Sequence, residues 1–189
     1  MPQTFPTETL ITPRLLLRKC TPETYHHVFE HFNKEEQMSF FGFTAPEALA
    51  REQEKYAKGM ATYNRTFLYF HLLDKETNEL IGWCGFHTWY TEHRRAEIGY
   101  QLTNDAYKNK GLMSEAIAPI IAYGFEQMQL NRIEAFVGHQ NTASLNIMQK
   151  MKFTKEGNMR SHYFKNGVME DSLVFSLLQS ENLFVRDFC

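Results

Sequence analysis

Cysteine and long apolar runs are both scarce in this sequence. Its 189 residues include three cysteines, Cys20, Cys84 and Cys189, and no CxxC pair. An odd number at wide spacing argues against a disulfide framework and against a cysteine zinc site, so we expect a reducing, cytoplasmic compartment. The longest largely apolar stretch, residues 116–125, is far shorter than the roughly 20 residues that a bilayer requires. We therefore expect no membrane partner.

An excess of charge of one sign is also lacking. The net charge is −2, which argues against nucleic acid as a partner, because phosphate backbones need a clustered basic surface.

The first 14 residues contain prolines and no apolar run, so we expect no signal peptide. Repeats and Gly/Ser-rich linkers are absent as well. These absences predict one domain over residues 1–189, with its core at about 12–178 and a frayed tail over 180–189.

Hydrophobic residues make up 43% of the chain and aromatic residues 14%, which is enough for a packed core. Periodicity and turn signals predict the following elements: strands at 14–19, 65–73, 80–90, 95–102, 132–137, 153–164 and 169–178, helices at about 21–33, 46–60, 110–128 and 141–151, and an aromatic connection at 38–44. Pro119 falls inside a predicted helix, where it should kink the helix or remove a backbone bond.

This order of elements predicts an α/β (α+β) fold with a mixed sheet covered by helices on both faces. Strands 95–102 and 132–137 should be parallel neighbours, joined by a right-handed crossover. A ligand is expected beyond the carboxyl end of the first of these two strands. The last two strands should form a hairpin around Asn166-Gly167, a strong turn dipeptide.

The segment between strand 95–102 and the following helix has the features of a phosphate-binding loop. It consists of Lys108, Asn109, Lys110, Gly111, Leu112 and Met113. A helix start leaves backbone N–H groups without partners and carries a partial positive charge, and a glycine lets the backbone approach an anion. We expect Glu115 to come only after the first helical turn, which would then contain no acidic residue. The segment predicts a pyrophosphate cradle, with a solvated surface turn as the alternative; it is neither a P-loop nor a dinucleotide fingerprint.

Four segments in order resemble the GCN5-related N-acetyltransferase (GNAT) superfamily and, within it, the ribosomal-protein N-terminal acetyltransferase (RimJ/RimL-like) branch. They are Thr12–Arg18, Ala96–Tyr100, Lys108–Ala116, and Asn141–Ser144 with Met151–Phe153 and Glu156-Gly157. The resemblance implies a GNAT fold with a mostly antiparallel sheet of about seven strands. It also implies acetyl-CoA as the cofactor and an amine as the acceptor.

Four positions depart from the family pattern, and one of them is Lys152, which replaces the glycine before the family's phenylalanine. Lys108 stands where Gln or Arg is usual, and Met113 replaces a small residue and could crowd the ligand. Met148 occupies the helical position at which many members carry a tyrosine that protonates the departing thiolate. The resemblance therefore implies that this acid lies elsewhere in the chain.

Acetyl transfer to an alkylamine needs a base, because the free amine has a pKa near ~10. Glu97 is the predicted base, acting through a water. It lies mid-strand and faces away from Ile98 and Tyr100, where a carboxylate is costly unless that face borders a cleft. The resemblance supports this role. The alternative is a structural ion pair with Arg94 or Arg95.

The resemblance assigns further roles along the cofactor. Ser144 is expected to interact with the leaving thiolate, and Asn141 to contact the cofactor. Alternatively, Asn141 caps a helix and Ser144 is an ordinary first-turn residue; both can hold. A backbone N–H near Gln101 or Leu102 is expected to hold the oxyanion.

Residues for the acceptor are less specific. Tyr163 stands where the branch carries an acidic residue that assists the acceptor amine. Phe40, Phe41 and Phe43 are expected to line the acceptor pocket or to be buried under the helices.

The remaining reactive side chains point to no metal and no second nucleophile. His27 and His31 are spaced as a helical pair, but no third ligand is placed beside them. His87 is expected to pack on a strand, His139 to border the cleft, and Cys84 to lie in the core.

Three classes of function remain after the sequence is considered alone. The first is an N-acetyltransferase, a monomer or homodimer, acting on a protein N-terminal α-amine or on a small-molecule amine. The second is an acetyl-CoA-binding module without a working base. The third is an interaction domain with no cofactor.

Overall fold

A computed structural model describes residues 7–59 and 66–182. Its elements run in the order β1 (Thr9–Ile11), β2 (Leu15–Cys20), α1 (Pro22–His31), α2 (Lys34–Phe41), α3 (Pro46–Ala57), β3 (Thr66–Asp74), β4 (Leu80–Tyr90), β5 (Arg95–Leu102), η1 (Asp105–Tyr107), α4 (Leu112–Glu126), β6 (Arg132–Gly138), α5 (Thr142–Lys150), β7 (Thr154–Lys165), β8 (Val168–Leu178) and η2 (Gln179–Glu181). None of these helices is long and apolar enough to cross a bilayer.

The strands form one eight-stranded sheet in the order β1-β2-β3-β4-β5-β6-β8-β7. Only β5 and β6 are parallel neighbours; the other pairs are antiparallel. The predicted mixed, mostly antiparallel sheet is therefore confirmed. It has one strand more than the roughly seven expected, because the short segment Thr9–Ile11 pairs with β2 at the edge.

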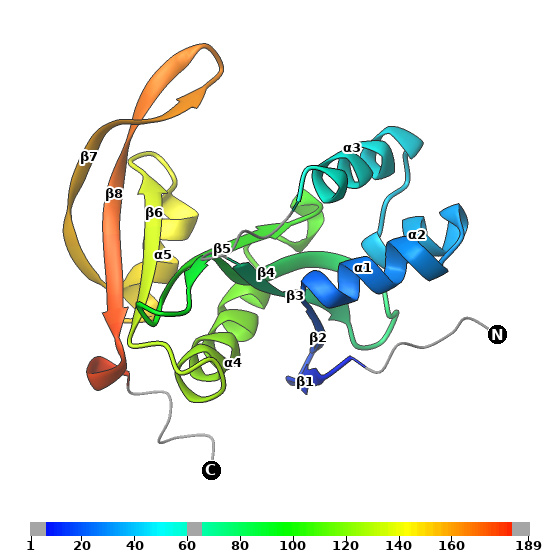
Figure 1. The fold of residues 1–189 in the computed structure, drawn as a ribbon. Helices are drawn as coiled ribbons and strands as arrows, with labels where there is room; N and C mark the ends of the chain where they lie inside the picture. The colour runs from blue at the N-terminus through cyan, green and yellow to red at the C-terminus, as the bar shows by residue number, and fades with distance from the viewer. Residues whose placement is uncertain (1–6, 60–65, 183–189) are drawn as a thin grey trace.

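Helices cover both faces of the sheet, as predicted (Figure 1). On one face, α1, α2 and α3 pack with Tyr25, Val28 and Phe41 against Phe67 of β3. On the other face, α4 packs against a larger cluster that includes the fully buried Phe86 of β4. Successive residues of β3 belong to the two different clusters, as the alternation of side chains along a strand requires.

The aromatic connection expected at residues 38–44 is wrong in part, because α2 covers most of it. Asn33 caps this helix and exchanges hydrogen bonds with Glu36 in a capping box, and Gly42 ends it in the left-handed region at φ 66. Both signals are present in the sequence. The predicted tail at 180–189 begins instead as the short turn η2; residues 183–189 lie outside the described part of the chain.

The feature that shapes the site is the separation of β5 from β6. The two strands pair in parallel only at Arg95–Glu97 and Arg132–Glu134. Beyond Glu97, β5 continues to Leu102 along β4, while β6 continues to Gly138 along β8. The sheet therefore opens between the carboxyl ends of two neighbouring strands. Helix α4 follows this opening and runs through Pro119 without interruption; nothing in the structure explains the proline.

Candidate active site

The start of α4 has the backbone of an anion-binding loop. Gly111 is the N-cap residue, lies in the left-handed region at φ 74, and provides no side-chain cap. The first helical hydrogen bond runs from the Glu115 N–H to the Gly111 carbonyl at 3.0 Å, so the amides from Leu112 to Ser114 precede it. A Cβ built on Gly111 would meet only Arg14 Nη2, at 3.8 Å, among the described atoms within 4 Å. The loop is therefore open on this side.

Positive charge surrounds this loop. Lys108, Asn109 and Lys110 are exposed, and Lys108 forms an ion pair with Asp105. Arg14 donates from Nη1 to the Lys110 carbonyl at 3.0 Å. Periodicity and spacing gave no hint that Arg14 joins the loop, because the two are far apart along the chain.

The side chains of Leu112 and Met113 point away from the loop. Both are buried in the hydrophobic cluster under α4, at 6% and 8% exposure. The Met113 side chain therefore belongs to the core, and both residues contribute their backbone to the loop.

Glu115 corrects the expectation that the first turn of α4 is free of acid. Its carboxylate accepts from Thr12 Oγ1 at 2.7 Å, from the Arg14 N–H at 2.8 Å and from Arg14 Nε at 2.7 Å. Burial alone would raise the pKa of Glu115, but these hydrogen bonds outweigh it and lower the pKa. The carboxylate thus holds the start of β2 and Arg14 beside the loop.

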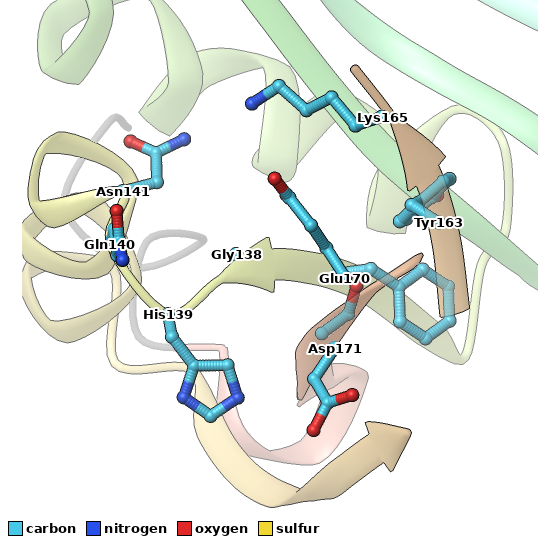
Figure 2. Close-up of a pocket in the computed structure, with 10 residues that line it drawn as sticks. Gly138, His139, Gln140, Asn141, Tyr163, Lys165, Glu170 and Asp171 are labelled. Carbon is cyan, nitrogen blue, oxygen red and sulfur yellow. The ribbon is translucent and has the colours of Figure 1, made fainter. Parts of the chain in front are cut away.

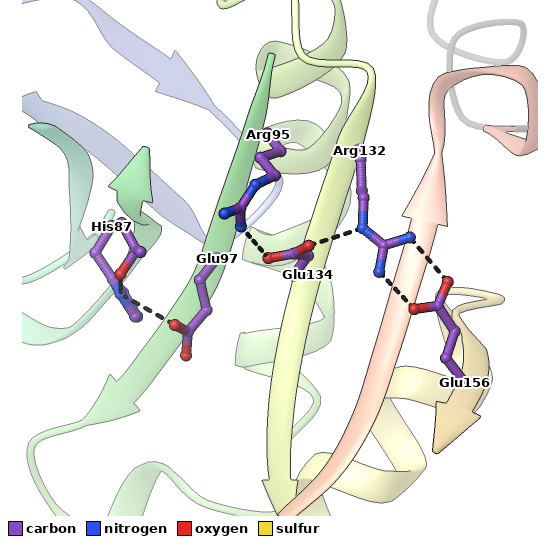
Figure 3. A network of polar contacts seen from close by, with 7 residues as sticks. His87, Arg95, Glu97, Arg132, Glu134 and Glu156 are labelled. Carbon is purple, nitrogen blue, oxygen red and sulfur yellow. Dashed lines mark hydrogen bonds and ion pairs between the residues drawn. The ribbon is translucent and has the colours of Figure 1, made fainter. Parts of the chain in front are cut away.

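Glu97 is the last residue of β5 that pairs with β6, and the two strands begin to part at this point. Its side chain is 14% exposed, and the His87 imidazole lies beside it, with Nδ1 3.6 Å from Oε2 (Figure 3). Burial, and then the charge of Glu134, raise the pKa of Glu97 to about 7. Burial also lowers the pKa of His87, which favours its neutral form. Glu97 is therefore ionised in part of the molecules at neutral pH.

The two arginines expected as alternative partners of Glu97 bind elsewhere. Arg94 donates from Nε to the Gln129 carbonyl at 2.7 Å. Arg95 donates to Glu134 at 2.8 Å, and Arg132 contacts the same carboxylate at 2.8 Å. Arg132 also binds Glu156 of β7, so this chain of charges joins β5, β6 and β7 and passes over β8 (Figure 3).

Ser144 and Asn141 adopt the geometry of a helix start. The Ser144 N–H donates to Asn141 Oδ1 at 3.1 Å, which makes Asn141 the N-cap of α5. Ser144 is 9% exposed. Burial raises the pKa of Tyr100 to about 12, and a hydrogen bond with the Ser144 side chain acts in the opposite direction. The two hydroxyls are thus neighbours, a pairing that the sequence pattern did not indicate. Met148 is fully buried.

Gln101 and Leu102 lie on the part of β5 that has left β6. They pair with Trp83 and Gly82 of β4 on one side. Their other edge faces the opening, because the pairing with β6 ends at Glu97. A strand edge of this kind can pair with amide groups of a ligand.

A polar cavity of about 540 Å³ lies at the end of β6, between α5 and the β7–β8 hairpin. In Figure 2, Glu170 and Lys165 project into this space opposite Asn141. Tyr163 lines it and pairs in register with Glu170, so the carboxylate in this region comes from the neighbouring strand. Burial and the charge of Glu97 raise the pKa of Tyr163, which puts the hairpin within electrostatic reach of Glu97.

The predicted aromatic residues divide between two places. Phe41 and Phe43 line a second cavity of about 430 Å³ between the α1–α3 layer and the sheet, here called the aromatic cavity. The Phe40 ring lies over the Arg18 guanidinium at 4.0 Å.

The other candidate side chains take simpler places. His139 lines the polar cavity and bonds Asn158 at 2.7 Å. The rings of His27 and His31 lie 4.6 Å apart, and the described residues contain no group of three or more potential metal ligands. Cys84 is fully buried, and burial raises the pKa of its thiol.

Comparison with known proteins gives consistent matches. The model of the acetyltransferase (GNAT) domain matches residues 14–154. An uncharacterized N-acetyltransferase of Bacillus subtilis, YoaA, is 34% identical over 90% of this chain and 96% of its own length. The crystal structure of a GNAT-family acetyltransferase from Bacillus anthracis aligns with a TM-score of 0.65 and 27% identity, over 92% of this chain and all of its own.

Two further relatives match about half of the chain. A putative ribosomal N-acetyltransferase of Bacillus subtilis is 31% identical over 54% of this chain and 55% of its own length. The spermidine N(1)-acetyltransferase of Escherichia coli is 29% identical over 48% of each chain.

Proposed function

Because the chain belongs to the GNAT family of N-acetyltransferases, we propose that it transfers the acetyl group of acetyl-CoA directly to a primary amine, with Glu97 as the general base. The observation that carries this proposal is the position of Glu97. It is the last residue of β5 paired with β6, and its pKa is raised to about 7. A general base works best when its pKa lies near the working pH.

The residues around Gly111 fit the diphosphate of coenzyme A. The open left-handed turn, the amides that precede the first helical bond and the nearby Arg14 and Lys110 suit a doubly charged anion. The free edge of β5 at Gln101 and Leu102 suits the amide-rich arm that follows the diphosphate. When bound, acetyl-CoA supplies an activated acetyl thioester.

Glu97 removes the proton that the attacking amine must lose. Its carboxylate accepts this proton directly or through a water, and the neutral imidazole of His87 beside it adds no charge to hold Glu97 ionised. The proton then has a path to solvent, because the Glu97 side chain is not fully covered.

Ser144 is placed to stabilise the sulfur that leaves. Its hydroxyl can donate a hydrogen bond or a proton to that sulfur, and Tyr100 beside it can orient the hydroxyl. Met148, at the position of the usual tyrosine acid, is buried and has no proton to give. The backbone near Gln101 supplies an N–H for the oxyanion.

The acceptor is a primary amine of a protein N-terminus or of a small molecule. The names of the two partial relatives point to ribosomal proteins and to spermidine, and both substrates present such an amine. The opening between β5 and β6 lies between the polar cavity and the aromatic cavity, so either kind of acceptor has a surface to contact.

Two measurements test the proposal. Acetyl-CoA should raise the thermal midpoint, since a ligand at about a hundred times its Kd adds ~3 kcal/mol to the free energy of unfolding; Lys110→Ala should weaken this effect. A panel of amines and N-terminal peptides should then release free thiol from acetyl-CoA. Binding of acetyl-CoA without turnover of any amine would favour a non-catalytic module. If acetyl-CoA causes no thermal shift, the chain does not bind this cofactor.

A further inference from the structure

The helices α1, α2 and α3 cover one face of the sheet (Figure 1). The aromatic cavity lies between these helices and the sheet. Five aromatic rings from four parts of the chain line it: Tyr25, Phe41, Phe43, Tyr69 and Trp83. Several of the rings touch one another. Tyr25 and Phe41 have centroids 5.0 Å apart, as do Tyr69 and Trp83. Such walls favour organic cations, because the faces of aromatic rings carry partial negative charge.

The cavity also contains one well-covered carboxylate. Glu52 of α3 lines it, and its side chain is 13% exposed. Burial, and then the charge of Glu52, raise the pKa of Tyr25, so the phenol lies close to this carboxylate. The ion-pair partner of Glu52 is Lys55 at 2.9 Å, whose side chain is 67% exposed. Both residues line the cavity, but the Glu52 carboxylate is covered, whereas the Lys55 side chain extends into solvent.

The floor of the cavity adds no positive charge on its surface. His71 lines it, and burial, with Arg18 behind it, lowers the pKa of the imidazole to about 3. Arg18 Nη2 lies 2.9 Å from His71 Nδ1 and has only hydrogens to give. His71 is therefore held as the neutral tautomer with its proton on Nε2. The Arg18 charge itself is covered by the Phe40 ring and bonded to the Phe40 carbonyl.

Tyr69 links this cavity to the proposed base. After burial, the charges of Glu52 and Glu97 are the causes that raise its pKa to about 12. The phenol therefore lies within electrostatic reach of both carboxylates. Trp83, beside Tyr69, reaches β5 close to Glu97, since a Cβ on Gly99 would lie 3.2 Å from its ring. An acceptor with its amine at Glu97 can extend along these two rings towards Glu52.

We propose that the aromatic cavity is a subsite for a second positive charge on the acceptor, an alkylammonium that displaces Lys55 from Glu52. This inference rests on the proposed function, because it places the reacting amine at Glu97. Lys55 is a resident competitor: its ammonium holds the carboxylate until the acceptor arrives. Because the Lys55 side chain is 67% exposed, its ammonium can move into solvent when another cation takes its place beside Glu52. The acceptors selected are linear diamines and related dications rather than monoamines.

The experiment compares diaminohexane with hexylamine, which differ by one ammonium group. Isothermal titration calorimetry without acetyl-CoA measures their binding to the wild type, Glu52→Gln, Lys55→Met and Lys58→Met. Lys58→Met is the matched control, because Lys58 follows α3 and pairs with Glu54, and neither residue lines the aromatic cavity. The kcat/KM values for both amines, from thiol release, provide a second readout.

The wild type should bind the diamine at least about tenfold more tightly than the monoamine. Glu52→Gln should abolish this preference, Lys55→Met should strengthen diamine binding by about threefold or more, and Lys58→Met should change neither. Weaker diamine binding in Lys55→Met would overturn the subsite. Lys55 is largely exposed, so this variant should fold even if Glu52→Gln does not.

Failure of the subsite and failure of the proposed function are distinct outcomes. If both amines are acetylated with no preference that depends on Glu52, the subsite is wrong and the transferase stands. If diamine binding follows the expected pattern but no amine is ever acetylated, the subsite stands and the proposed function is wrong. Absence of any diamine preference in the wild type overturns the subsite as well.

Discussion

Glu97 and Glu134 are the same residue at facing positions of two neighbouring strands, yet the side chains around them differ in charge. They stand opposite each other on β5 and β6, and both side chains are 14% exposed. Glu134 contacts two arginines, Arg95 and Arg132, whereas Glu97 has a neutral histidine 3.6 Å away. At equal exposure, Glu134 is thus surrounded by compensating charge and joins strands, whereas Glu97, the proposed base, has no cationic partner among the described residues.

Replacing the uncompensated carboxylate should have the largest effect. Glu97→Gln removes the proposed base and should lower kcat about a hundred- to ten-thousand-fold, with acetyl-CoA binding unchanged in a thermal-shift assay. Glu134→Gln, with the same chemical change on the neighbouring strand, should retain most of its activity. Equal losses in the two variants would show that Glu97 has no special role.

Glu97→Gln should also stabilise the fold above neutral pH. Below pH 4.5 the Glu97 carboxyl is protonated in the folded and unfolded chains alike. Between its usual pKa of 4.5 and about 7, only the unfolded chain ionises, so the free energy of unfolding falls as pH rises. Glu97→Gln should therefore add up to ~3 kcal/mol at pH 8 and almost nothing at pH 4. Urea titrations at the two pH values measure this difference.

Glu134→Gln should destabilise the fold instead. It leaves Arg95 and Arg132 without their shared partner, and loss of one member of a partly buried ion network costs about 1–3 kcal/mol. Arg132 keeps Glu156, and the Arg95 guanidinium keeps the Tyr90 ring at 4.4 Å, which limits the loss. A midpoint in urea equal to that of the wild type at pH 8 would contradict the structural role of Glu134.

Arg95→Met should have the smallest effect. It removes one of the two cations that compensate Glu134, so the Glu134 charge acts more strongly on Glu97 and raises its pKa further. The acidic limb of the pH–rate profile should move up by less than about one pH unit. A downward move would show that Glu134 does not act on Glu97 in this way.

The sequence predicted the elements of this fold well where the signals are local. Asn166-Gly167 marks the turn of the β7–β8 hairpin, and the left-handed Gly111 starts α4 as expected. The residues that cap α2, Asn33 and Gly42, are visible in the sequence. The aromatic residues between them nevertheless favoured a connection over a helix in the sequence-based prediction. β1 has three residues and exists only through its pairing with β2, which no local pattern indicates.

Individual residues of the candidate site could be predicted from the sequence, but their arrangement in space could not. Glu97 could be singled out as a carboxylate on a strand, but its partners depend on which strand lies beside β5 and where the two part. Arg14 reaches the Lys110 loop through tertiary packing alone. The aromatic cavity needs α1, α2, α3 and three strands at once, so Glu52 gave no signal in the sequence.

The most direct test of the account is the dependence of kcat/KM on pH for the wild type and Glu134→Gln, measured side by side at saturating acetyl-CoA. The wild-type rate should rise with pH and level off around an apparent pKa of about 7. In Glu134→Gln the same limb should move to lower pH, because the repelling charge is gone while burial remains. Identical limbs in the two proteins, or a wild-type limb near the ordinary glutamate value, would contradict the assignment of Glu97 as the base.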